Sequence, residues 1–122
     1  MGDTELLDML ATETDRRSGT IVKGVQKLAK SGKSDPAKVE ELRVEAHGLK
    51  GAAMVVGQER LAQLALGMEE ALASRAESGQ IDPALADSIV GAINALHDGT
   101  KAAAEGAAEP PSVEQSIKAL GG

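Results

Sequence analysis

The stretch LRVEAHGLKGAAMVVG, from Leu42 to Gly57, decides the fold class of this chain. Its apolar residues recur at alternating intervals of four and three residues, which is the spacing of a narrow buried stripe on an α-helix. The residues of this stripe are Leu42, Ala46, Leu49, Ala53 and Val56. Because a glycine follows the last of them, we predict a helix over about residues 36–56 that buries one face against other helices.

Three further segments carry apolar residues at helical spacing. They span about residues 4–30, 58–78 and 83–101. Asp35 or Ser34 before Pro36, and Asp82 before Pro83, are typical of an N-cap followed by the first helical residue. Four such segments with short connections predict an all-α fold, an antiparallel up-down-up-down four-helix bundle.

The middle of the first segment is its weakest part. Thr14, Ser18 and Gly19 interrupt the apolar stripe between Leu10 and Ile21. We therefore expect this helix to bend there or to pack more loosely than its neighbours.

A chain of 122 residues with 42% hydrophobic composition supports one core and one domain. We expect this domain to span residues 1–104. Residues 105–122 begin with small residues and prolines and are predicted to be a linker or tail. Within the tail, Val113, Ile117 and Leu120 predict one or two turns of amphipathic helix, docked loosely at most.

Composition excludes several classes of function. A net charge of -6 repels nucleic acid and anionic membranes, and the absence of aromatic residues leaves no stacking platform for bases. The absence of cysteine excludes a cysteine-based zinc site. No apolar run reaches the roughly 20 residues of a membrane span, and the start MGDTELLDML lacks the basic flank of a secretion signal. We expect a cytoplasmic domain that binds neither nucleic acid nor membrane.

His47 is the candidate for chemistry. An advance of about 100° per residue places it roughly 140° from the buried stripe, on the solvent side of its helix. Arg43 lies one turn before it, Lys50 lies one turn after it, and Gly51 leaves a gap beside it. A neutral imidazole nitrogen is a nucleophile near neutral pH, and cations stabilise a phosphoryl group bound to it. This arrangement predicts a histidine that accepts and donates a phosphoryl group.

Two glycines in the helix interior need a reason, since each costs about 0.5 to 1 kcal/mol relative to alanine. Gly51 is expected to leave room for a partner protein near the ring. Gly48 lies on the flank and is expected to allow close packing of helices at the edge of the docking surface. Arg43 and Met54 are the other residues that we assign to partner docking.

The run HGLKGAA, residues 47–53, followed by Gly57, resembles the H-x-x-K-G-[SA]-[SA] signature of histidine-containing phosphotransfer (HPt) domains. Residues 46–72 are also similar to the amino-terminal phosphotransfer domain of chemotaxis-type histidine kinases, and the likeness extends over about residues 4–104. Two features depart from the pattern. Ala52 stands where many members have serine, and Met54 lies in a region where chemotaxis members often carry aromatic residues.

The resemblance implies a phosphorelay intermediate without its own ATP site, either a free-standing protein or the amino-terminal module of a larger histidine kinase. His47 would carry the phosphoryl group, Lys50 would pair with its oxygens, and Gly51 would leave room for the partner. A histidine kinase and a response-regulator receiver domain would be the partners of a monomeric domain. No cofactor is implied for the chain itself, and Mg²⁺ would be held by the receiver.

Other interpretations of the sequence are weaker. A helical bundle that docks a signalling partner through Met54, without phosphate chemistry, is the alternative function. His97 has glycine and lysine at the wrong offsets for an acceptor, and an interaction with the end of its helix is its expected role. The acidic pairs Glu40 with Glu41 and Glu69 with Glu70 are expected on polar faces, without a part in catalysis or metal binding.

Overall fold

The computed structural model describes residues 3–121, and every regular element within them is a helix. The helices are α1 (Asp3–Ser31), α2 (Pro36–Val55), α3 (Glu59–Ala73), α4 (Pro83–Glu105) and α5 (Pro111–Ala119). The predicted all-α class is confirmed. Residues 1, 2 and 122, which the predicted domain bounds include, lie outside the described residues.

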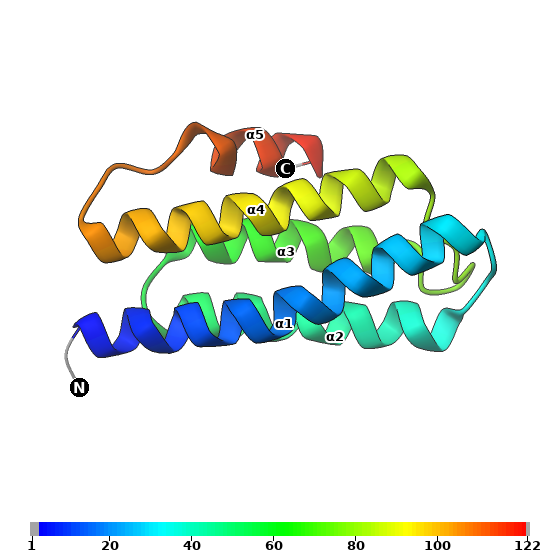
Figure 1. The fold of residues 1–122 in the computed structure, drawn as a ribbon, viewed down its shortest axis with the longest axis horizontal. Coiled ribbons are helices and arrows are strands. Elements are labelled where there is room, and N and C mark those ends of the chain that lie inside the picture. Colours follow the sequence, from blue (N-terminus) through cyan, green and yellow to red (C-terminus); the bar gives the residue numbers. More distant parts are fainter. Residues whose placement is uncertain (1–2, 122) are drawn as a thin grey trace.

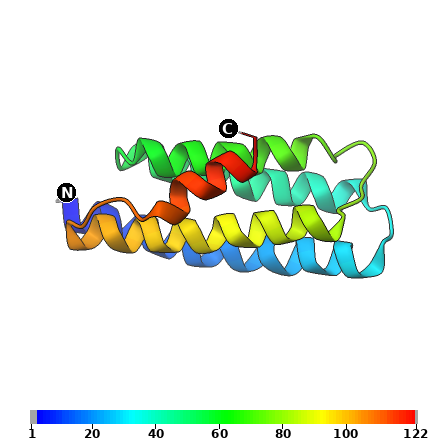
Figure 2. The same cartoon turned by 90° about the horizontal axis from the view of Figure 1, so that it is seen from above.

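The four long helices lie side by side, and successive helices from α1 to α4 run in alternating directions (Figure 1). Helix α1 packs against α2 and α4, and α3 packs against the same two helices. Seen from above in Figure 2, α5 crosses obliquely over α3 and α4. Among the described helices, none is both long and apolar enough to cross a membrane.

Helix α2 has the rotation that its sequence predicts. Leu42, Ala46, Leu49 and Ala53 are buried, and the Asp35 side chain accepts a hydrogen bond from the Lys38 backbone N–H at the first turn. The helix ends at Val55, and Gly57 follows the cap with a φ of 75°, which suits a residue without a side chain. This rotation turns position 47 away from the core.

Helix α1 differs from its prediction. Thr14 and Ser18 are buried in line with Leu10 and Ile21, and the helix is uninterrupted from Asp3 to Ser31. The prediction of looser packing was wrong at Thr14 and Ser18, because small hydroxyl side chains also fit a buried stripe. Hydrophobicity alone did not identify this face.

The end of the chain forms a docked helix. Val113 and Ile117 of α5 are buried in the same core as the long helices. Arg60 of α3 pairs with Glu109 before α5 and with Glu114 inside it. The expectation of a loosely docked turn was wrong, because two fully covered apolar side chains and these ion pairs attach α5 to α3 and α4.

Candidate functional site

His47 lies on the outer face of α2, and its side chain is 61% exposed. Its Nδ1 atom lies 2.9 Å from Oε2 of Glu69, which comes from α3. The antiparallel pairing of α2 and α3 brings these two residues together across 22 positions of sequence. The candidate site therefore spans the outer surface where these two helices meet.

Glu69 is the centre of the charged groups around the histidine. Its side chain is only 12% exposed, and Lys50 Nζ lies 3.1 Å from Oε1 while Arg43 Nη1 lies 3.1 Å from Oε2. Burial works against ionisation of this carboxyl, but the hydrogen bonds and positive charges of Lys50 and His47 outweigh it. The pKa of Glu69 therefore lies below its usual value, and the group is a carboxylate at neutral pH.

Sequence reasoning missed Glu69. It placed this residue on a polar face with no functional part, whereas the structure puts it in contact with three side chains of the candidate site. The available signal was its position directly after Met68, at the edge of the buried stripe of α3. That signal needs the register between α2 and α3, which the spacing of residues within one helix does not contain.

Arg43 and Lys50 contact Glu69, whereas the sequence suggested that they contact the His47 ring. Arg43 and Lys50 were predicted to flank the ring directly. In the structure both contact the Glu69 carboxylate, and Arg43 also binds Glu40, with Nη2 2.5 Å from Oε1. The ring and its two neighbouring cations therefore share one anionic partner.

The contact with Glu69 assigns different roles to the two ring nitrogens of His47. A carboxylate accepts hydrogen bonds, so the proton of a neutral ring belongs on Nδ1. Nε2 then carries the free lone pair, and the exposure of the ring leaves that atom open to a reagent from outside. A largely covered acid that orients a histidine in this way favours the opposite nitrogen as the nucleophile.

The two glycines of the motif have different surroundings. A Cβ atom added at Gly51 would meet no heavy atom within 4 Å beyond its own helix backbone. A Cβ atom at Gly48 would lie 2.3 Å from Cζ of Arg17, which reaches over from α1. Gly51 is therefore open toward solvent, while the space at Gly48 is filled by an arginine.

A family model described as the Hpt domain matches residues 5–105 of the chain. The chain belongs to the Hpt domain family. This membership supports a histidine phosphotransfer role in a two-component phosphorelay, with two-component kinases and response regulators as the classes of partner. Hpt domains are phosphotransfer modules without an ATP site of their own. A comparison with curated protein sequences gives no match.

Apolar side chains of this Hpt domain are exposed near the end of α2 and on α3. Met54 and Val55, at the end of α2, are exposed, and so is Leu66 on α3. Met54 was expected to lie on the surface rather than in the core, and its exposure is confirmed. Met54 lies two helical turns after His47 on α2, so the exposed face of this helix carries an apolar side chain beyond the histidine.

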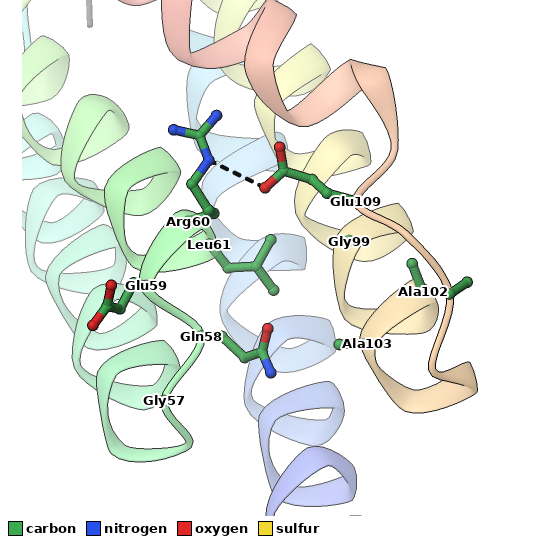
Figure 3. A pocket seen from close by; sticks show the side chains of 10 residues that line it. Gly57, Gln58, Glu59, Arg60, Leu61, Gly99, Ala102, Ala103 and Glu109 are labelled. Atoms are coloured by element: carbon green, nitrogen blue, oxygen red, sulfur yellow. Dashed lines mark hydrogen bonds and ion pairs between the residues drawn. The ribbon is translucent and has the colours of Figure 1, made fainter.

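A pocket of about 350 Å³ lies elsewhere on the Hpt domain, between the start of α3 and the end of α4 (Figure 3). It is bordered by Gln58, by Ala103, and by the paired Arg60 and Glu109. His47 does not line it. The histidine thus lies on an open helical face, which suits a protein partner better than a small molecule.

Proposed function

We propose that His47 accepts a phosphoryl group on Nε2 and passes it to or from the aspartate of a response-regulator receiver domain. The observation that carries this proposal is the 2.9 Å contact between Nδ1 and Glu69, because it directs the Nε2 lone pair outward. The proposal includes the antiparallel four-helix bundle of α1 to α4 as the scaffold that sets this geometry.

The chemistry is a displacement at phosphorus. The Nε2 lone pair forms the N–P bond while the bond from phosphorus to the donor oxygen breaks, and that oxygen keeps the electron pair. The ring gains positive charge as the N–P bond forms, and the Glu69 carboxylate lies against the Nδ1 proton that carries part of this charge. In the reverse direction the aspartate oxygen attacks phosphorus, and Nε2 recovers its lone pair.

The charges near the ring then have a second task. A phosphoryl group adds about two negative charges to the exposed ring. Lys50 is bound to Glu69 beside His47 and has ammonium protons to offer to the phosphoryl oxygens. We assign this contact to Lys50, while Arg43, bound on its other side by Glu40, serves the docking surface.

The surface around His47 supports a receiver domain as the partner. The open space at Gly51 admits another protein close to the ring, and the exposed Met54 supplies apolar contact. Within the described residues, no group of three or more histidine, cysteine or acidic side chains is placed to hold a metal ion. We propose that Mg²⁺ is held by the receiver, where it neutralises charge on the acyl phosphate. The proposal also places the chain in the cytoplasm as a monomer.

The test is to load the full chain with a histidine kinase and ATP and to locate the phosphate. We expect one phosphoryl group on His47 by mass spectrometry, lost on heating in acid as a phosphohistidine is. Addition of a receiver domain should remove it and label the receiver aspartate. A chain that stays unlabelled with every kinase but binds a receiver would instead establish the docking-module alternative.

A further inference from the structure

Arg17 of α1 lies against Gly48, the residue that follows His47, and has no part in the reaction proposed above. Arg17 of α1 lies largely covered between α1 and α2, with Nε 2.9 Å from Oε2 of Glu13 and Nη1 3.3 Å from Oε1 of Glu45. Its guanidinium fills the space of the absent Gly48 side chain. The next residue back along α2 is His47.

Gly48 differs from the glycines that let helices approach. At Gly24 and Gly99, an added Cβ would collide with leucine side chains of a neighbouring helix. At Gly48 it would collide with Cζ at 2.3 Å, Nη1 at 2.4 Å and Nε at 2.7 Å of a single guanidinium. Glycine at this position therefore admits a cation to the flank of α2 at the residue that follows the exposed histidine, with some loss of helix propensity.

One nitrogen of the Arg17 guanidinium makes neither of the two carboxylate contacts. Its two carboxylate contacts use Nε and Nη1, so the Nη2 amino group takes part in neither. Glu13 is also bound by Arg16, whose Nη2 lies 2.8 Å from Oε2, and so keeps a cationic partner if Arg17 turns away. Arg17 has both a free donor group and a partner that does not depend on it alone.

We propose that Arg17 is a second phosphoryl-binding residue, which donates Nη2 hydrogen bonds to the phosphoryl oxygens on His47 from the α1 side. This inference rests on the proposed function. Lys50 approaches from the α3 side through Glu69, and Arg17 approaches from the opposite flank through Glu45. Gly48 is the residue that provides the place for its guanidinium.

The physical reason is the match between guanidinium and phosphate. An arginine presents paired donors in a fixed plane and keeps its charge at every physiological pH, so it holds a phosphoryl dianion with defined geometry. Hydrolysis of the phosphohistidine breaks the P–N bond as water adds to phosphorus, and protonation of the ring promotes this step. A cation on the phosphoryl oxygens opposes ring protonation and should lengthen the life of the N–P bond.

The experiment measures that lifetime without any partner protein. The full chain carrying His97→Gln, so that His47 is its one histidine, is phosphorylated with phosphoramidate, and the decay of the phosphohistidine signal at neutral pH is followed by ³¹P NMR. Arg17→Gln should shorten the lifetime about two- to fivefold, the range for loss of one charge pair near the protein surface. Lys23→Gln removes the same charge from an exposed position of α1 and should leave the lifetime unchanged.

A second variant guards against a folding defect in Arg17→Gln. Gly48→Ala keeps the arginine, raises helix propensity and places a methyl group where the guanidinium lies. It should shorten the lifetime in the parent chain but have no further effect in the Arg17→Gln background, because the two changes remove one contact. Equal effects of Gly48→Ala in both backgrounds would overturn the inference.

The outcomes separate the inference from the function on which it rests. A parent chain that takes no phosphoryl group on His47 overturns both. A labelled parent whose lifetime is unchanged by Arg17→Gln, or shortened equally by Arg17→Gln and Lys23→Gln, overturns the role of Arg17 and leaves the phosphotransfer function in place.

Discussion

The two histidines of this chain both face a carboxylate, yet their surroundings differ. His47 uses Nδ1 to contact Glu69, a carboxylate that is only 12% exposed. His97 of α4 uses Nε2 to contact Asp15 of α1 at 3.2 Å, and that carboxylate is 78% exposed. The more exposed ring therefore has the more buried partner.

The difference shows what a histidine needs to act as a directed nucleophile. A largely covered carboxylate that is held by Lys50 and Arg43 fixes the ring and its tautomer, whereas an exposed carboxylate is screened by water and fixes little. The Nε2 atom of His97 is also covered from solvent. Both histidines lie near a carboxylate. The candidate acceptor His47 differs in having a largely covered carboxylate and an Nε2 atom that does not contact it.

The largest expected effect compares the histidines directly. His47→Gln should abolish phosphorylation by a histidine kinase, while His97→Gln should leave it at the parent level, because Nε2 is free only at position 47. Incorporation of labelled phosphate from ATP measures both. Label that persists in His47→Gln would show that His47 is not the phosphoryl acceptor.

The rotation of α2, which turns His47 outward, predicts a contrast in stability. Leu49→Ala should lower the free energy of unfolding by about 2 to 5 kcal/mol, because it leaves a cavity in the core. Met54→Ala should cost less than about 1 kcal/mol, since this side chain is exposed. Urea titrations compare the two variants, and similar losses would show that the outward face has been assigned wrongly.

The open space beside His47 has no counterpart at His97, where Lys101 takes the position four residues later. Gly51→Gln should slow transfer to a receiver about a hundredfold by displacing the partner from the ring. It should also raise helix stability by roughly 0.5 to 1 kcal/mol, because it removes an interior glycine and meets no neighbour. The transfer rate and melting temperature are measured on one sample. A folded variant that transfers at the parental rate contradicts the role of the gap.

Substitution of Glu69 and Asp15 tests whether the carboxylate beside each histidine determines its reactivity. Glu69→Gln keeps the size of the side chain but removes the charge that holds the Nδ1 proton, and it should slow phosphorylation of His47 about tenfold, less than the loss in a buried catalytic triad. Asp15→Asn is the matched control beside His97 and should leave the rate unchanged. Equal rates in all three chains would show that the Glu69 contact does not direct the ring.

The smallest effect is a dependence of stability on pH. The pKa of Glu69 is lowered from its usual value of 4.5, so its contribution to stability is fully present above that value and is lost as pH falls through the lower native pKa. The difference in free energy of unfolding between the parent chain and Glu69→Gln should therefore narrow below about pH 4.5. A difference that stays constant down to the acid transition would show that the ionised form is not favoured by the fold.

Much of the site could be predicted from the sequence, because most of its residues lie on one helix. The spacing of Leu42, Ala46 and Leu49 fixes the rotation of α2, and this rotation decides that position 47 is exposed. The same spacing places Lys50 and Gly51 one turn away. Relations between residues three or four positions apart follow from helical geometry alone.

The sequence by itself thus determined the helical class, the start and end of α2, and the exposed histidine with its open glycine. Only the tertiary structure decided that Glu69 faces the ring, that Arg17 fills the space at Gly48, and that α5 is docked. The physical reason is that these contacts join residues of different helices. Their register and crossing depend on how all the apolar faces pack together, which no periodicity within a single helix encodes.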